Sequence, residues 1–260
     1  MRYAHATIML AMAAATCAPA RAGFIDAAYT GVAAGRNVSL TVGASTFDTF
    51  AGQIGFTLSN GSGDAATLNG SRLMFCADPY QRVSSSSQRY ERLPIESLPV
   101  SSGVPTMGGS KAQALRDIYA GTSAAAFQAG ASADAAAAFQ IAIWEIIVDY
   151  DPVVGPSSID PASGALRARS SGSNQLASSI TAQFDLLRAL IGRNLAAAGL
   201  VGLGNPSYQD QVMQIPSPGS VALLLGAGLS AIVPRRGRSS RAAATVAPAG
   251  PPRDHPSSRD

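Results

Sequence analysis

The chain has 260 residues, of which 47% are hydrophobic but only 6% are aromatic, and its formal net charge is +3; this length allows one good-sized domain or two small ones. Of the 19 basic residues, two lie within residues 1–22 and six follow Pro234; of the 16 acidic residues, two follow Pro234. Residues 23–234 therefore carry 11 basic and 14 acidic side chains, a net charge of about −3. A weakly acidic body lacks the positive surface that nucleic acids require, which excludes a nucleic-acid partner.

Residues 1–22 have the pattern of a secretory signal peptide. Arg2 and His5 give a short positive start, residues 6–15 are largely apolar, and small residues around Ala20 offer a cleavage site. Removal of this segment also removes Cys17 and leaves Cys76 as the single cysteine. A lone cysteine in an oxidising compartment cannot form an intramolecular disulfide, so Cys76 needs another explanation.

The stretch from residue 32 to residue 76 is strand-like. Polar and apolar residues alternate in residues 37–42, 53–58 and 71–76, and glycines separate these runs as turns. In a continued strand Cys76 and Asp78 would point to the same face, and Pro79 would end the ladder.

Helices are expected in the middle of the chain. We predict a loop over 81–110 and then a short helix over 111–120, with Ser110 as its cap. A central helix follows from a cap at Ser132 or Asp134 to about residue 146. After a loop over 151–172, we predict a second long helix over 174–198 and a closing strand over 209–215. Strands followed by helices favour an α+β fold, with an N-terminal antiparallel sheet or sandwich carrying Cys76 and a helical subdomain carrying Gln140.

The central helix carries one amide on an otherwise apolar face. Ala136, Gln140, Ile143, Trp144 and Ile147 share that face at helical spacing. A buried glutamine costs stability unless its carboxamide is hydrogen-bonded or chemically changed. Two interpretations are therefore open: Gln140 pairs with a nearby backbone group, or it reacts with Cys76.

The end of the chain has a different pattern. Residues 221–233 are apolar or small, which is short for a membrane span of about 20 residues, and an arginine cluster that would stay in the cytoplasm follows. This arrangement resembles the PEP-CTERM sorting signal over residues 215–238, carried here by Pro216, Ser217, Pro218, Arg235, Arg236 and Arg238. The resemblance implies a Gram-negative exported protein, transient anchoring in the inner membrane, cleavage by an exosortase, and delivery to the cell surface or extracellular matrix. Serine stands where that signal usually has glutamate, and residues 239–260, which follow it, are expected to be disordered.

A second resemblance covers roughly residues 30–215, within an expected domain of 23–214. Phe50-Ala51-Gly52-Gln53, Phe75-Cys76-Ala77-Asp78 and, 64 residues after Cys76, Gln140 within Phe139–Trp144 are together similar to the Cys-Gln thioester domains of bacterial surface adhesins. The resemblance implies that the Cys76 sulfur replaces the Gln140 side-chain nitrogen, and that the buried thioester later attaches covalently to an amine or hydroxyl of a partner. Gln128 also follows a phenylalanine, but Ala129-Gly130 does not match the motif.

Supporting roles follow from the chemistry of such a bond. A thiolate must attack and the leaving nitrogen must be protonated, so Asp78 is a candidate proton shuttle, although capping a turn before Pro79 is an equally good role for it. The thioester must be shielded from water, and the residues expected to do so are Phe75, Phe139, Ile143 and Trp144.

Three hypotheses then remain for the function. The first is a thioester adhesin; the second is a non-reactive surface or matrix protein of the same fold, in which Cys76 is only a small buried hydrophobe. The third, a hydrolase, is disfavoured because both histidines, His5 and His255, lie in the terminal segments, which removes His-dependent catalysis and His-ligated metal sites. No enzyme activity, metal or cofactor is expected.

Overall fold

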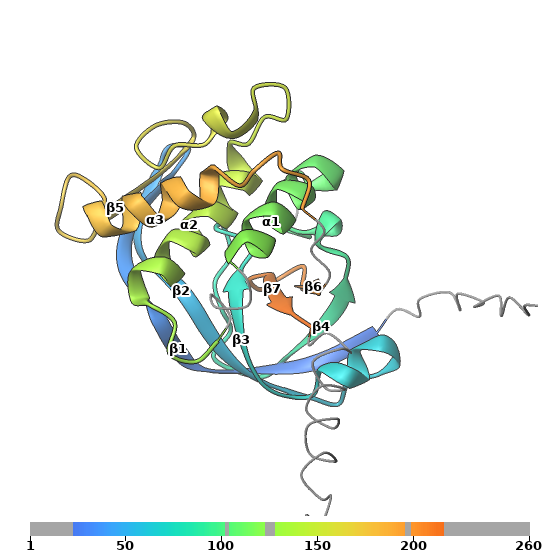
Figure 1. Cartoon of the computed structure of the whole chain (residues 1–260). Helices are drawn as coiled ribbons and strands as arrows, with labels where there is room; N and C mark the ends of the chain where they lie inside the picture. Colours follow the sequence, from blue (N-terminus) through green and yellow to red (C-terminus); the bar gives the residue numbers. More distant parts are fainter. Residues whose placement is uncertain (1–22, 102–103, 123–127, 196–198, 216–260) are drawn as a thin grey trace, which may run out of the picture. The chain divides into compact units, whose positions relative to one another are not determined.

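The computed structural model describes residues 23–101, 104–122, 128–195 and 199–215, and these residues form an α+β fold with one large antiparallel sheet and a layer of helices (Figure 1). The signal peptide (1–22), the sorting signal from Pro216 onward, its apolar run 221–233 and the tail 239–260 lie outside the described residues. Within the described ranges, none of the helices combines the length and hydropathy that a bilayer-crossing segment requires.

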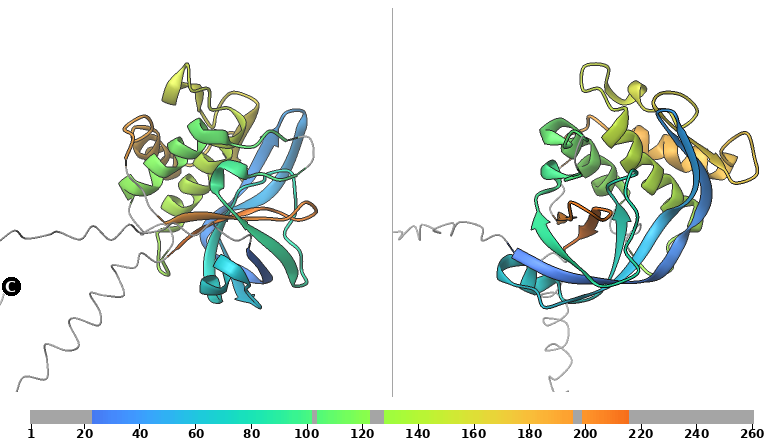
Figure 2. Two further views of the ribbon diagram at one scale, coloured as in Figure 1. Left: turned by 90° about the vertical axis from the view of Figure 1, so that its right-hand side faces the viewer. Right: turned by 180° about the vertical axis from the view of Figure 1, so that it is seen from behind.

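The sheet contains seven strands in the order β2-β3-β7-β6-β4-β1-β5. Their bounds are β1 (Gly23–Val42), β2 (Ser45–Ser59), β3 (Gly70–Cys76), β4 (Gln88–Leu93), β5 (Leu166–Ser170), β6 (Leu200–Gly204) and β7 (Gln211–Gln214). Because β1 also pairs with β2, the first six strands of this order close into a ring, and β5 pairs with the second half of β1. The two long strands β1 and β2 curve around the others (Figure 2).

The β1–β2 hairpin follows from the alternating sequence. Val38, Leu40 and Val42 are buried on one face of β1, and Gly43 makes the two-residue turn with a φ of 58° that a side chain would disfavour. The pairing register shifts between Val32 and Gly35, where a Cβ on Gly35 would lie 2.4 Å from the backbone oxygen of Ala51. These irregularities bend the hairpin and let it curve around the core.

Among the described residues, three α-helices lie on one side of the strands: α1 (Gly108–Thr122), α2 (Ala133–Val148) and α3 (Ser178–Arg188). Short 3₁₀ helices occur at η1 (Gly63–Leu68), η2 (Ile95–Ser97) and η4 (Gly155–Ser158). Helix α2 is buried at every position from Ala136 to Ile147, because it packs against α3 as well as β1 and β2. An apolar pattern on all sides is what a helix enclosed by neighbours requires.

The α+β prediction is confirmed, and so are the strands over 37–42, 53–58 and 71–76, the helix around 111–120, the central helix preceded by Ser132 and a closing strand within 209–215, which is β7. The prediction that Ser110 caps the first helix is wrong, because α1 begins at Gly108 and Ser110 lies inside it. The predicted loops over 81–110 and 151–172 are wrong in part, because they contain β4 and β5. The sheet is also not confined to the N-terminal half, since β5, β6 and β7 complete it as one continuous sheet. The helix predicted over 174–198 is shorter, running from Ser178 to Arg188, and its apolar residues Ile180, Phe184 and Leu187 are buried.

Candidate functional site

Cys76 is the last residue of β3, and its backbone N–H and C=O are not paired with the neighbouring strand β2. Strand β3 pairs with β2 only as far as Met74, but with β7 as far as Cys76. The next residue, Ala77, donates its N–H to the Asp210 carbonyl on the β7 side at 2.8 Å. Because successive residues of a strand direct their backbone groups to opposite sides, the N–H and C=O of Cys76 face the side that β2 has left open.

The Gln140 side chain from α2 occupies that open position. Its Oε1 accepts the N–H of Cys76 at 2.8 Å, and its Nε2 donates to the Cys76 carbonyl at 2.8 Å. Both residues are buried, with Gln140 fully inaccessible and Cys76 1% exposed. The amide therefore pairs with the backbone of the cysteine that the sequence motif joins to it, which brings the two predicted residues together.

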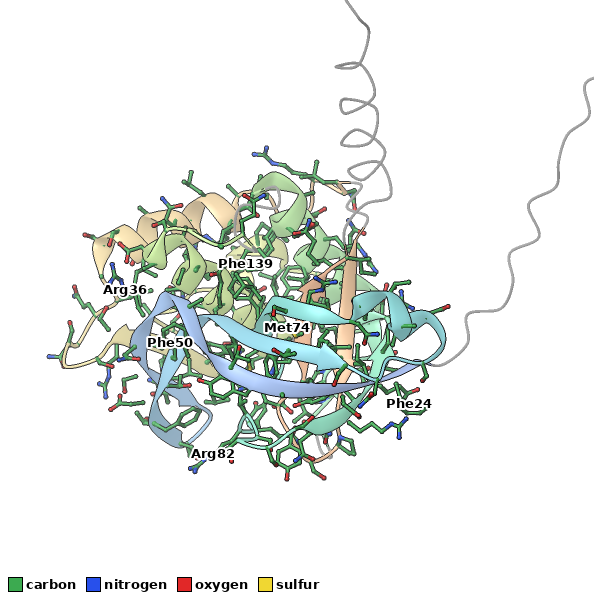
Figure 3. All side chains as sticks on the ribbon, turned by 90° about the horizontal axis from the view of Figure 1, so that it is seen from below. Phe24, Arg36, Phe50, Met74, Arg82 and Phe139 are labelled. Carbon is green, nitrogen blue, oxygen red and sulfur yellow. The ribbon has the colours of Figure 1, made fainter. Side chains whose placement is uncertain are left out.

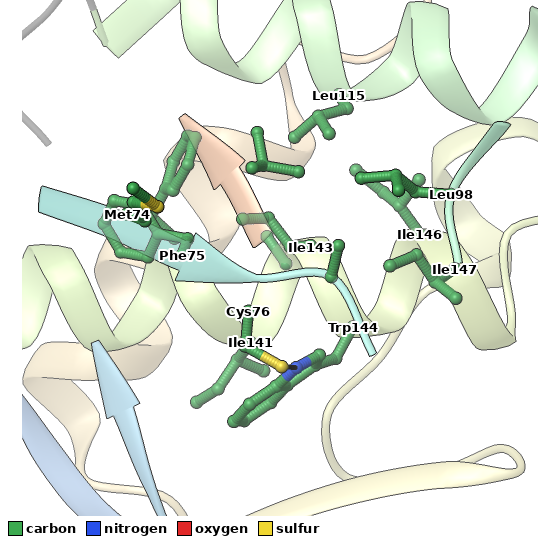
Figure 4. Close-up of a cluster of buried hydrophobic side chains, with 14 of the residues drawn as sticks. Met74, Phe75, Cys76, Leu98, Leu115, Ile141, Ile143, Trp144, Ile146 and Ile147 are labelled. Carbon is green, nitrogen blue, oxygen red and sulfur yellow. Dashed lines mark hydrogen bonds between the residues drawn. The ribbon is translucent and has the colours of Figure 1, made fainter. Parts of the chain in front are cut away.

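The Cys76 sulfur lies among three polar groups. Its thiol donates to the Asp78 carbonyl at 3.1 Å, while Sγ accepts the Asp78 N–H at 3.4 Å and the Trp144 indole N–H at 3.3 Å (Figure 4). Burial raises the pKa of the Cys76 thiol well above its usual value, although the contacts with Trp144 and Asp78 oppose this. At rest Cys76 is a thiol, and attack requires a base.

Aromatic and aliphatic side chains enclose the pair. The rings of Phe75 and Phe139 lie 5.0 Å apart between centroids, at 60°, and Ile143 and Trp144 are buried beside them. All four residues predicted to form the shield are thus buried in the core, and Trp144 contacts the sulfur directly.

Asp78 does not lie on the strand as predicted, because β3 ends at Cys76. Its Oδ1 accepts the Tyr80 N–H at 2.8 Å, which is the turn-capping role considered for it. Its Oδ2 is buried and has no hydrogen-bond partner among the described residues. The carboxyl group therefore caps a turn with one oxygen and keeps the other available close to Cys76.

Sequence reasoning missed Asp210, which is fully buried at the start of β7. Its oxygens accept the N–H groups of Asn205 and Val100 at 2.7 and 2.6 Å, and burial raises its pKa to about 6. Asp210 thereby ties the β6–β7 turn and the segment before α1 to the strand that flanks Cys76. A single aspartate in the polar run 208–211 carries no sequence signal of this role.

Gln53, from the first motif, pairs with the backbone of Gln128, the glutamine that does not match the motif. Gln53 is buried on β2 and donates to the backbone oxygen of Gln128 at 2.9 Å, whereas Gln128 itself is exposed. This agrees with the assignment of the reactive amide to Gln140 and not to Gln128.

A cavity of about 900 Å³ reaches this site, with Cys76 and Trp144 among the residues that line it. No cluster of three or more potential metal ligands occurs among the described residues. Comparison of the chain with family models, with curated proteins and with solved structures gives no match.

Proposed function

We propose that Cys76 and Gln140 form an internal thioester and that the protein is an exported surface protein that attaches covalently to a partner. The observation that carries this proposal is the double hydrogen bond between the Gln140 amide and the backbone of Cys76. It holds the electrophilic carbon beside the residue that bears the nucleophile, and both residues are buried. Proximity of this kind can lower a reaction barrier by several kcal/mol, about 7 or more in well-oriented cases.

The same contacts support the chemistry of bond formation. The Cys76 N–H donates to Oε1, the atom on which negative charge develops when sulfur attacks the Gln140 carbonyl carbon. The S–C bond forms, the C–N bond breaks, and the thiol proton leaves with the nitrogen as part of ammonia. Asp78, whose Oδ2 has no partner among the described residues, is the group we propose to move that proton.

Export and sorting complete the proposal. The segments that resemble a signal peptide and an exosortase signal lie at the two ends of the chain, outside the described residues. The proposed processing partner is therefore an exosortase-type enzyme at the inner membrane, and the proposed target is an amine or hydroxyl on another surface. Turnover is not part of this function, because each thioester reacts once.

The intact mass of the exported protein tests the thioester directly. We expect it to be one ammonia lighter than the mature sequence, and to gain one methylamine when that amine is added, because methylamine attacks the thioester carbonyl and returns the proton to sulfur. A Cys76→Ala variant is expected to have the full sequence mass and not to react with methylamine. A wild-type mass equal to the sequence mass, with Cys76 alkylated after unfolding, would exclude the bond.

The Asp78→Asn variant distinguishes the proposed proton-shuttle role of Asp78 from its turn-capping role. Asparagine can still accept the Tyr80 N–H through its side-chain oxygen, so we expect the melting temperature to stay close to that of the wild type. We expect the ammonia-deficient form to appear at least about tenfold more slowly after synthesis, measured by intact mass over time. Formation at the wild-type rate would assign Asp78 to the turn alone.

The second candidate function is a non-reactive surface or matrix protein of the same fold. It is supported by the pairing of the Gln140 amide, which satisfies the polar group without any covalent change. Under this alternative the mass is unshifted, and the Cys76→Ala variant retains full function.

A further inference from the structure

The cavity that reaches Cys76 has an opening rich in aromatic side chains. It lies between the β1–β2 hairpin and the segment 79–85, and Figure 3 labels two of its lining residues, Phe50 and Arg82. Of the eight large hydrophobic side chains that the described residues expose, four line this one cavity: Tyr29, Val32, Phe47 and Tyr80. Tyr80 is 53% exposed and Phe47 39%. Such clustering of exposed apolar surface around a hollow marks a binding site.

The polar part of the lining is neutral overall. Its charged members are Asp48 and Arg82, one of each sign, and the others carry hydroxyl or amide groups: Ser45, Thr49, Gln81, Ser84, Ser85 and Gln209. The Oε1 of Gln81 is buried with no hydrogen-bond partner among the described residues. The wall therefore offers aromatic faces together with donors and acceptors, without an excess of either charge.

We infer that this cavity binds a neutral glycan. A sugar ring presents C–H faces that pack on aromatic rings and a rim of hydroxyl groups that pair with amides, hydroxyls, a carboxylate and a guanidinium group. A volume of about 900 Å³ is far larger than one amine side chain needs and is within the range of sites for small molecules of several rings.

The covalent consequence of glycan binding rests on the proposed thioester, and the glycan is then the class of partner to which the protein attaches. A hydroxyl of the bound glycan would attack the Gln140 carbonyl carbon, forming a C–O bond as the C–S bond breaks, and its proton would pass to the Cys76 sulfur. The product is an ester that links the protein to the glycan. The group of the natural partner that attacks the thioester is then a glycan hydroxyl and not an amine.

The test uses the full-length Cys76→Ala protein, which cannot form a thioester, so that non-covalent binding is measured alone. The probes are cellohexaose, maltohexaose and chitohexaose, with Nα-acetyl-lysine methylamide as the amine probe. Binding is followed by calorimetry and by the fluorescence of Trp144, which is the one tryptophan of the chain and lines the cavity. We expect saturable binding of at least one hexasaccharide.

Substitutions in the Cys76→Ala background locate the binding. Tyr80→Ala and Phe47→Ala are each expected to weaken it by about tenfold or more. Leu186, on α3, is an even more exposed apolar residue outside this cavity, and Leu186→Ala is expected to leave binding unchanged. Circular dichroism confirms that each variant is folded. Binding of no hexasaccharide, binding indifferent to Tyr80 and Phe47, or binding of the amine probe alone would overturn the inference. An unshifted wild-type mass together with glycan binding would instead refute the thioester and still support the cavity as a glycan-binding site.

Discussion

Replacement of Gln140 by alanine is expected to lower the free energy of unfolding by about 3 to 5 kcal/mol, because it leaves the N–H and C=O of Cys76 unpaired in the core and opens a cavity beside them. The measurement is denaturant unfolding of Cys76→Ala against Cys76→Ala/Gln140→Ala, so that no thioester contributes to either protein. Gln128→Ala is the matched control, since this glutamine is exposed, and a change within about 0.5 kcal/mol is expected for it.

Gln140→Glu separates hydrogen bonding from thioester formation. Burial favours the neutral form of the introduced carboxyl group, which then accepts the Cys76 N–H and donates to the Cys76 carbonyl as the amide does. We expect this variant to be substantially more stable than Gln140→Ala at acidic pH and yet never to lose ammonia or add methylamine. Equal stability of Gln140→Ala and its parent would show that the pairing with Cys76 contributes nothing to the fold.

Glu145→Gln is expected to stabilise the protein above neutral pH and to flatten its stability profile. Glu145 is fully buried on α2; its Oε2 accepts the Asp160 N–H at 3.1 Å, and its Oε1 has no partner among the described residues. Burial, together with the nearby carboxylates of Asp149 and Asp160, raises the pKa of Glu145 from 4.5 to about 9. The folded protein therefore holds this carboxyl group in its neutral form at pH 7.

The direction of the pH effect follows from proton binding. Between pH 4.5 and about 9 the folded state keeps the Glu145 proton and the unfolded state releases it, so the contribution of Glu145 to the free energy of unfolding falls as pH rises through this window and is level outside it. The loss by pH 7 is about 3 kcal/mol, an order-of-magnitude figure. Urea unfolding at several pH values measures it. In Glu145→Gln the slope between about pH 6, above the titration of Asp210, and about pH 9 is expected to disappear. Glu91→Gln, at a half-buried position on β4, should retain it; an unchanged slope in Glu145→Gln would contradict the assignment.

The sequence predicted those elements whose periodicity is strong. Residues 37–42 alternate because one face is buried, and the apolar run of α2 reflects burial on all sides. Strand β4 could not be recognised, because Gln88–Leu93 is mostly charged or polar and only Tyr90 is buried in it. It is a strand because β1 and β6 flank it and supply hydrogen bonds, which is tertiary information.

The candidate site was predictable in its residues but not in its geometry. The motif spacing selected Cys76 and Gln140, whereas their contact depends on β2 ending its pairing at Met74 and on α2 lying against that gap. The prediction for Asp78 was wrong in its strand position, because β3 ends before it and the chain turns at Tyr80. The cavity was missed altogether, since its wall is assembled from the hairpin, the segment 79–85 and Gln209.

The closed ring of strands sets an order of events for a chain that emerges from its N-terminus. Cys76 and Gln140 are both synthesised long before Gln211–Gln214, yet β7 is the strand that holds the other edge of β3 and brings Asp210 into place. Contacts of such long sequence separation form late in folding. The sulfur therefore acquires its final surroundings only when nearly the whole domain has been made, so the thioester that we propose would form only once the chain is almost complete.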